Sequence, residues 1–493
     1  MKTQCIHKKI NRGQPQSGIT SLLFILLVGM TLSVATIGYV ASMKTMQSSA
    51  VTTHAQTQAQ MQTMIGYQAL SEFLKDPNLD IDEITAINTG TVTSTTGQVI
   101  NYKKSEDCPT GTGNYCFDII GESGGAKAIL RALFKLTDKV STSTATGSIF
   151  AGGLNVFGNA GFSGIVGVNG EKPSIAVGAN TKAGTAAGVI TGGGTVTNIT
   201  VNPYLEDTTF PDAAKLLPYA NYIFTLNDKG KVVCHQNNLY SSTSTPKDIT
   251  TKVTMTPCPP SGVSRGKYKG NDVWEFDSHL ANLPGIIWFD GDVLLKLHQT
   301  PNDYINSVIA TGIVETDQVD GKTTYKAYAP YHYLLEADNS NIKNRLLKVC
   351  PADKYPTQYC KPYSQAERDK ITDTAYFDNH KSDFLKDMEA YPANLANILL
   401  LTDTGFTLTS NPDSPMFLYG NLIGTRGAGG TGAASGKFNG NADINIFGNI
   451  MITGDTLTEM GGSTKLKLGK AKGGGNTIPT IVKSVTPSSI SYQ

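Results

Sequence analysis

The stretch GITSLLFILLVGMTLSVATIGYVASM, residues 18–43, decides how this chain is organised. The residues from Ile19 to Met43 carry no charge and are mostly apolar. At about 1.5 Å per residue, a helix of this length can cross the hydrocarbon core of a bilayer, which is about 30 Å thick. Four basic residues precede it in a short leader: Lys2, Lys8, Lys9 and Arg12. Positive charge stays on the cytoplasmic side, so everything after Lys44 is predicted to lie across the membrane.

The position of Gly18 separates this segment from an ordinary secretory signal. Such a signal has a shorter apolar region with a small-x-small cleavage site after it, whereas Gly18 stands before the apolar run. A basic leader, a glycine and a hydrophobic stretch that continues into a helix resemble type IV prepilins. The resemblance implies cleavage by a prepilin peptidase between Gly18 and Ile19, followed by N-methylation of Ile19. Gly13 is a second candidate, but the polar residues 14–17 follow it, and a plain signal anchor is the alternative.

The fifth residue of the predicted mature chain is Leu23, where most pilins carry Glu. The absence of this glutamate is typical of the PilX-type minor pilin and of the K-type pseudopilin of type II secretion. The resemblance covers about residues 12–75, with weaker support to about residue 140. It implies a minor pilin in a tip or initiation complex, which supports pilus biogenesis, adhesion, twitching motility or DNA uptake.

The same resemblance implies where the protein acts and with what. The implied partners are other minor pilins, a PilY-type tip adhesin, the major pilin and the prepilin peptidase, with DNA contacted only indirectly. The protein would cross the inner membrane once, with its body in the periplasm, and then move to the pilus tip. The alternatives are a membrane-anchored surface adhesin, a carbohydrate-binding solenoid and a K-type pseudopilin.

The balance of charge argues against a general nucleic-acid binder. The chain of 493 residues contains 41 Lys and Arg against 40 Asp and Glu, and loss of the leader would remove four of the basic residues. A nearly neutral chain offers no broad basic surface. The 51 glycines, with many Thr, Ser and Asn residues, favour short strands joined by tight turns.

The cysteines fit an exported protein. Cys5 lies in the leader, and the other six fall into close pairs: Cys108 with Cys116, Cys234 with Cys258, and Cys350 with Cys360. Six cysteines allow fifteen connectivities, but local pairing closes three small loops and needs no distant partner. Export supplies an oxidising compartment. Zinc is the alternative, but its usual C-x2-C spacing is absent, so three local disulfides are predicted.

The membrane helix is predicted to continue outward, so that one long helix covers residues 19–76. Apolar residues recur at helical spacing from Met61 to Leu74, and Pro77 then ends the pattern. The amphipathic outer half would be buried under a small α+β head over residues 77–143.

Within this head, two strands are expected at residues 99–102 and 115–120. The pair Gly124-Gly125 reads as a turn, and residues 126–135 are assigned to a hairpin strand. A helix over 126–135 is the alternative by period, but the turn and the PilX-type resemblance favour the hairpin.

The predicted fold class is α+β with a predominantly β body, a parallel β-solenoid over residues 144–472. Short apolar runs end in an aromatic-Gly-Asn corner at three places, with a looser copy at residues 289–292. Such corners suit a solenoid, because Gly or Asn accepts the positive φ of the turn and each coil stacks on its neighbour. A twisted β-sandwich is the alternative. The three corners are Phe157-Gly158-Asn159, Tyr419-Gly420-Asn421 and Phe447-Gly448-Asn449.

Two stretches interrupt the repeat and are predicted to be insertions, at about residues 203–283 and 317–397. Each contains one close cysteine pair, and a helix is expected around Asp373 to Glu389. The Gly-, Ser- and Thr-rich end, residues 473–493, is predicted to be a flexible tail.

Three motifs invite a catalytic, metal or nucleic-acid hypothesis. The sequence around Ser123, GESGG, matches the G-x-S-x-G pattern of serine hydrolases, but no βαβ series supports a nucleophile elbow. The acidic residues 76–83 alternate like half an EF-hand loop, yet Ile81 and Ile87 stand where Gly and Glu belong. The lysines between Lys465 and Lys472 are read as a solvated edge strand rather than a DNA contact.

These readings predict no enzyme, no catalytic residue, no cofactor and no metal site. Carbohydrate chemistry on a solenoid would need a cluster of carboxylates or Arg. Asp290 and Asp292 alone are more easily corner residues.

Overall fold

The computed structural model describes most of the chain. The described residues are 17–75, 88–111, 113–178, 190–203, 210–241, 247–299, 304–319, 324–335, 347–351, 353–358, 360, 392–425, 435–454, 456–471 and 477–493. They form two compact units, one made of residues 1–138 and 483–493, the other of residues 139–482.

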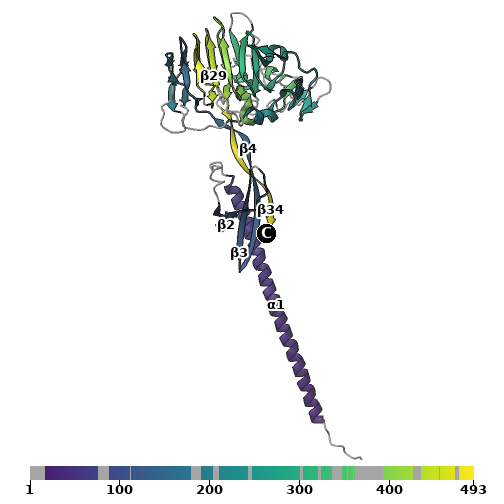
Figure 1. The fold of residues 1–493 in the computed structure, drawn as a ribbon. Helices are drawn as coiled ribbons and strands as arrows, with labels where there is room; N and C mark the ends of the chain where they lie inside the picture. The colour runs from purple at the N-terminus through teal and green to yellow at the C-terminus, as the bar shows by residue number, and fades with distance from the viewer. Residues whose placement is uncertain are drawn as a thin grey trace, which may run out of the picture. The chain divides into compact units, whose positions relative to one another are not determined.

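The first unit is a long helix with a five-stranded sheet, drawn in Figure 1. Helix α1 covers Ser17–Phe73, in agreement with the predicted long helix. The sheet has the order β1-β2-β3-β4-β34. Its strands are β1 (Thr89–Thr93), β2 (Val99–Lys104), β3 (Asn114–Ser123), β4 (Ala126–Thr144) and β34 (Thr477–Tyr492).

The predicted hairpin is confirmed. Strands β3 and β4 pair antiparallel from Ser123 opposite Ala126 to Asn114 opposite Lys135. Gly124 and Gly125 form the turn with φ of 52° and 82°, a region that favours glycine. The core between α1 and the sheet is built from apolar side chains that include Leu70, Leu74, Phe117, Leu130 and Phe134.

The C-terminal segment differs from the predicted flexible tail. Residues 477–492 form β34, the strand beside β4 at the edge of this sheet. The hydroxyls of Thr137 and Thr486 donate to carbonyls of the opposite strand, Ser484 at 3.3 Å and Lys135 at 3.2 Å. The head is therefore built from both ends of the chain, and residues 139–482 are inserted between its last two strands.

The second unit confirms the predicted parallel solenoid. Its strands stack in parallel on three faces. The first face contains β12 (Tyr222–Leu226), β19 (Gly285–Phe289), β21 (Tyr304–Ala310), β25 (Ile398–Thr402), β28 (Asn421–Gly424), β31 (Ile450–Ile452), β5 (Ser148–Phe150), β8 (Ser174–Val177) and β11 (Thr200–Pro203).

The second and third faces follow the same order along the stack. The second contains β18 (Asn271–Asp277), β20 (Val293–Leu297), β22 (Val314–Gln318), β26 (Gly405–Ser410), β29 (Ser435–Gly440), β32 (Thr458–Met460), β6 (Leu154–Val156) and β9 (Ile190–Thr191). The third contains β23 (Tyr325–Tyr328), β27 (Met416–Tyr419), β30 (Asp443–Phe447), β33 (Lys465–Gly469), β7 (Gly161–Gly164) and β10 (Thr195–Thr197).

The coils do not stack in the order of the sequence. The last coil, β31 to β33, pairs in parallel with the first, β5 to β7. Residues 148–203, in blue in Figure 1, therefore lie at one end of the stack, and the teal strands of residues 222–297 lie at the other. Apolar side chains fill the interior, and a second apolar cluster covers the outside of the first face.

The aromatic-Gly-Asn corners hold neighbouring coils together, as their spacing predicts. Gly420 has a φ of 136°, and a Cβ on Gly448 would overlap the carbonyl oxygen of Gly420. The buried Asn421 Oδ1 accepts hydrogen bonds from the backbone N–H (3.0 Å) and side-chain Nδ2 (3.3 Å) of Asn449. The ring of Tyr419 stacks on Phe447 with centroids 4.8 Å apart.

The first predicted insertion, residues 203–283, is largely part of the solenoid. It contains β12 and β18, which pair in parallel with β19 and β20. Each is joined by a tight turn to an antiparallel strand: β12 is followed by β13 (Val232–Gln236), and β18 is preceded by β17 (Val263–Tyr268). These antiparallel strands break the repeat in the sequence, which made the segment look foreign to the solenoid.

The second predicted insertion holds α5 (Pro330–Leu335), β24 (Lys354–Pro356) and the short helix η3 (Pro392–Asn397). The helix expected around Asp373 to Glu389 lies outside the described residues. All three predicted disulfides are present, Cys108–Cys116, Cys234–Cys258 and Cys350–Cys360.

Candidate functional site

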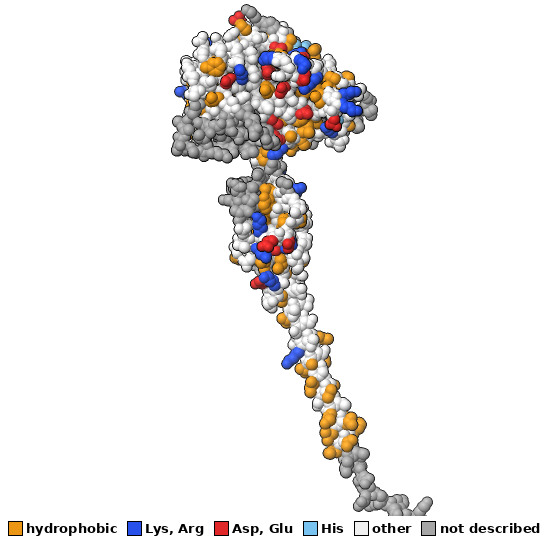
Figure 2. Space-filling model, viewed as in Figure 1, with side chains coloured by type: hydrophobic (Ala, Val, Ile, Leu, Met, Phe, Trp, Pro, Cys, Tyr) orange, Lys and Arg blue, Asp and Glu red, His pale blue; other side chains and the backbone are white. Residues whose placement is uncertain are grey.

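The exposed half of α1 is the most distinctive surface of the chain. It is the one helix among the described residues that is long and apolar enough to span a membrane, with a mean hydropathy of 2.2 over its best window. No described part of the chain covers that window. Figure 2 shows the apolar side chains in orange along this part of the helix. A surface of this kind requires lipid or protein around it.

Several hydroxyl groups in and just after this segment are hydrogen-bonded within the helix itself. Thr31 Oγ1 donates to the Val28 carbonyl at 2.9 Å, and Ser33 Oγ donates to the Gly29 carbonyl at 2.7 Å. Thr45 Oγ1 bonds in the same way to the Ala41 carbonyl at 2.9 Å. Because these polar groups need no water, the segment can enter a bilayer without leaving them unpaired.

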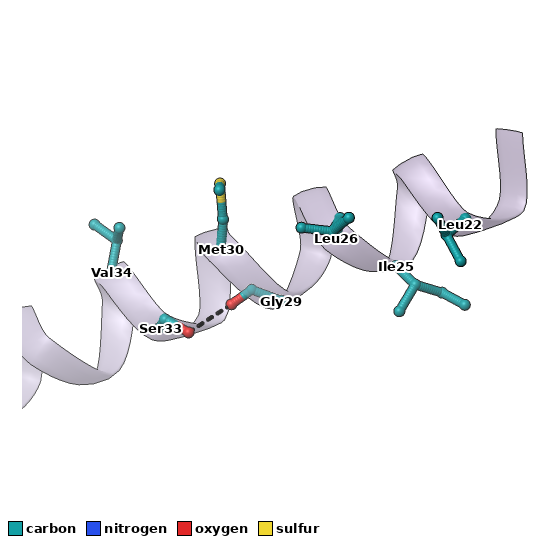
Figure 3. A pocket seen from close by; sticks show the side chains of 7 residues that line it. All are labelled: Leu22, Ile25, Leu26, Gly29, Met30, Ser33 and Val34. Atoms are coloured by element: carbon teal, nitrogen blue, oxygen red, sulfur yellow. Dashed lines mark hydrogen bonds between the residues drawn. The ribbon is translucent and has the colours of Figure 1, made fainter. Parts of the chain in front are cut away.

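A shallow groove on this helix centres on Gly29. Figure 3 shows Leu22, Ile25 and Leu26 on one side of the glycine and Met30 and Val34 on the other. Nothing described lies within 4 Å of the position that a Cβ on Gly29 would take. The backbone is thus open to close approach by another helix, the kind of contact that small residues permit in membranes.

The predicted processing residues lie at the start of α1. Gly18 and Ile19 are in its first turn, since the helix begins at Ser17. Leu23, in place of a glutamate, is 61% exposed. The first acidic residue of the whole chain is Glu72, so the free part of the helix presents no carboxylate to a neighbour.

The outer half of α1 is fixed under the head. Ala59 and Leu70 are fully buried, and a Cβ on Gly66 would lie 2.6 Å from Ile100 Cγ2. A Cβ on Gly121 in β3 would overlap the Ala59 carbonyl oxygen. These small residues let helix and sheet approach closely, so the head is attached rigidly to the helix it carries.

Ser123 belongs to this docking surface. Its hydroxyl donates to Gln58 Oε1 of α1 at 2.7 Å, and the Glu122 N–H donates to Gln62 Oε1 at 3.0 Å. The GESGG segment is the tip of the β3–β4 hairpin. The hairpin interpretation is confirmed, and the residue holds the tip of the hairpin against the helix.

The other acidic and basic candidates have structural partners. Asp290 Oδ1 accepts from Thr311 Oγ1 at 3.2 Å, and Asp292 Oδ1 accepts from the Ile313 N–H at 2.8 Å, so both are corner residues. Lys467 pairs with Asp443 at 2.6 Å, and Lys470 pairs with Glu171. The acidic residues 76–83 lie outside the described part of the chain. Among the residues described, no group of three His, Cys, Asp or Glu could hold a metal ion.

One ionisable site escaped the sequence analysis. Asp403 follows β25 and accepts hydrogen bonds from the Ala213 N–H at 2.8 Å and Thr425 Oγ1 at 3.0 Å. Burial raises the pKa of this carboxyl to about 6; the two hydrogen bonds oppose the shift and the charge of Asp212 adds to it. Asp403 thus fastens the helix α3 (Ala213–Leu216) to the outside of the solenoid. No local sequence motif marks this contact, because Asp403 and Ala213 are distant in sequence.

Comparison with known proteins yields little. No protein-family model matches the chain, and no curated protein matches it. Among solved structures, the competence-associated pilin ComZ from Thermus thermophilus aligns over 90% of this chain and 98% of its own, with 10% identity and a TM-score of 0.26. A TM-score this low transfers neither architecture nor function.

Proposed function

We propose that this protein is a minor pilin of a type IV pilus, which enters a tip or initiation complex and supports pilus biogenesis. The observation that carries the proposal is the helix α1, which is uncharged from Ile19 to Met43, uncovered over its apolar segment and fixed under a head over its outer part. The glycine-terminated basic leader in front of that helix adds the processing signal. Such a helix can be stored in the inner membrane and later packed among the helices of a filament.

The proposal extends to processing and partners. The prepilin peptidase would cleave between Gly18 and Ile19, and Ile19 would be N-methylated. The partners would be the other minor pilins, a PilY-type tip adhesin and the major pilin, with DNA contacted only indirectly. Leu23 offers no carboxylate to a neighbour's terminal amine, which supports a place at the end of a filament rather than within it.

The architecture of the body bears on the nearest alternative. A K-type pseudopilin would carry a mainly helical insertion, whereas the described part of residues 139–482 consists mostly of strands. This contrast supports membership of a type IV pilus rather than of a type II secretion system. It also supports a non-enzymatic role, since the described candidate residues for catalysis serve the fold.

A deletion strain tests the proposal. Loss of the gene is expected to reduce surface pili without changing the amount of major pilin, and the intact gene should restore piliation. A variant Gly18→Glu should fail to restore it, because processing is blocked, while Gly13→Glu should restore it fully. Normal piliation in the deletion strain with lost adhesion would contradict the proposal and favour a membrane-anchored adhesin.

A further inference from the structure

The two ends of the solenoid differ in how their strands are paired. At the end formed by residues 190–203, each face finishes in a strand with one described partner: β9 pairs with β6, β10 with β7 and β11 with β8. No other described strand lies beyond them. This end, which we call the open end, therefore presents three strand edges at once.

The backbone of these edge strands directs hydrogen-bonding groups outward. The Thr200 N–H donates inward to the Pro173 carbonyl at 3.0 Å, and the Thr195 N–H donates inward to the Ala160 carbonyl at 3.3 Å. In a parallel ladder alternate residues bond to opposite sides. The N–H and C=O of Val201 and of Val196 accordingly point away from the stack, and the Val201 side chain is 41% exposed.

The open end has no charge, and its partly buried apolar side chains lie among exposed Thr and Asn residues. Its sequence, ITGGGTVTNITVNP, contains no Asp, Glu, Lys or Arg. Ile190, Val196 and Ile199 pack on the interior core and are only partly buried. Natural proteins usually protect exposed strand edges with lysine or other charges, and terminal repeats of a stack usually carry a polar cap.

The opposite end shows both kinds of protection. The antiparallel strands β13 and β17 cover β12 and β18 there. The exposed Lys231, Lys267 and Lys269 lie on or beside these strands. Trp274, fully buried, closes the interior behind them. Strand β17 also has one described partner, but the lysine charges on and beside it disfavour pairing with another strand.

From this contrast we infer that the open end, residues 190–203, is an interface for the open end of a second copy of this chain. A single extended segment would pair with one of the three edges, whereas another open end has the same three-sided section and meets all three. It also covers the exposed part of Ile190, Val196 and Ile199 with identical apolar groups, and an uncharged surface does not repel its own copy.

The symmetry of the pair follows from the protected end. Two open ends that face each other form an isologous dimer with a twofold axis, which leaves neither open end for a third copy. The product is a closed dimer, not a fibre. If two copies are anchored in different filaments or cells, this contact would join the two filaments or cells. The contact itself does not depend on the proposed pilus role.

The test measures the mass of the full-length protein in detergent micelles by size-exclusion chromatography with light scattering. The wild type is expected to have twice the mass of one chain, at low and at high salt alike. Val201→Lys places a charge on the outward edge. This variant should have the mass of a single chain or dimerise about tenfold more weakly. Val201→Thr and the exposed control Ser463→Lys, which lies away from the open end, should remain dimeric.

Two measurements keep the outcome unambiguous. Intrinsic tryptophan fluorescence verifies that each variant body is folded, because both tryptophans, Trp274 and Trp288, lie inside it. A dimer that persists in folded Val201→Lys would show that another surface, such as the apolar helix, holds the copies together. That result, or a monomeric wild type, would overturn the inference.

Discussion

At the scale of single residues, buried polar side chains link one coil of the body to the next. Asn421 bonds to Asn449 across one corner, Asn221 Oδ1 accepts the Ile286 N–H at 2.9 Å, and Ser148 Oγ accepts the Ile450 N–H at 2.9 Å. In each case an oxygen of one coil accepts a backbone N–H of the neighbouring coil. A buried backbone N–H without such an acceptor would lower the stability of the stack.

Replacement of Asn421 tests this role. Asn421→Ala leaves the buried N–H of Asn449 without its acceptor and should lower the free energy of unfolding of the body by about 1–3 kcal/mol. Urea unfolding followed by tryptophan fluorescence measures the change. The exposed neighbour Asn441 provides the control, and Asn441→Ala should have almost no effect. Equal losses of unfolding free energy in the two variants would show that the hydrogen bonds at this corner do not stabilise the body.

Asp403 should make stability depend on pH. Because burial raises its pKa to about 6, the folded state binds the proton more tightly than the unfolded state does. This group therefore stabilises the fold progressively as pH falls from about 7 to about 4, and its charge costs stability above pH 6. The buried His332, whose pKa burial lowers to about 3, instead destabilises the fold as pH falls, and it does so in every variant.

Asp403→Asn isolates this contribution, since the amide oxygen can still accept both hydrogen bonds. The variant should melt at a higher temperature than the wild type at pH 8, and the difference should shrink towards pH 4. Asp272→Asn, at an exposed site paired with Lys267, should show no such pH-dependent difference. An Asp403→Asn protein that is less stable at pH 8 would mean that the charge itself holds α3.

At the scale of elements, the head depends on close approach between α1 and β3. Gly121→Val should push the strand away from the Ala59 carbonyl and loosen the head, while Gly38→Val on the free part of the helix meets no neighbour. Overpacking of this kind typically costs about 1–3 kcal/mol. Hydrogen exchange at the β3 amides, such as that of Ile119, should accelerate in the first variant only. Unchanged protection in Gly121→Val would contradict tight docking.

Elements whose structure is decided by a local sequence pattern could be predicted. The unbroken apolar run from Ile19 predicts α1, the Gly124-Gly125 turn predicts the β3–β4 hairpin, and short cysteine spacings predict all three disulfides. The aromatic-Gly-Asn corners predict the solenoid, because Gly or Asn accepts the positive φ of a tight corner.

Elements that depend on pairing between distant residues could not be predicted. Residues 477–492 contain Pro479 and Pro487 after a glycine run, a composition typical of a mobile tail, yet β4 supplies a partner edge for them. Strand β12 lacks a corner of the usual kind because it turns back into β13. The Asp403 contact with Ala213 likewise depends on coil order, which a repeat in the sequence does not reveal.

At the scale of the whole molecule, both chain ends build one small head, and the solenoid is inserted between its last two strands. The helix that carries this head is long and apolar enough in its free part to span a membrane. A body inserted between two strands can increase in size without disturbing the helix or the predicted processing site. The proposed function in assembly would depend on the first residues of α1, where the leader would be removed.

The mass of the N-terminal peptide of the mature protein, purified from cells that make pili, tests this account most directly. The account predicts a peptide that begins with N-methylated Ile19, and an unprocessed chain when Gly18 is replaced by Glu. A Gly13→Glu chain should be processed like the wild type. An intact leader from Met1 in the wild-type protein, or an N-terminus created by cleavage after the apolar segment, would contradict it.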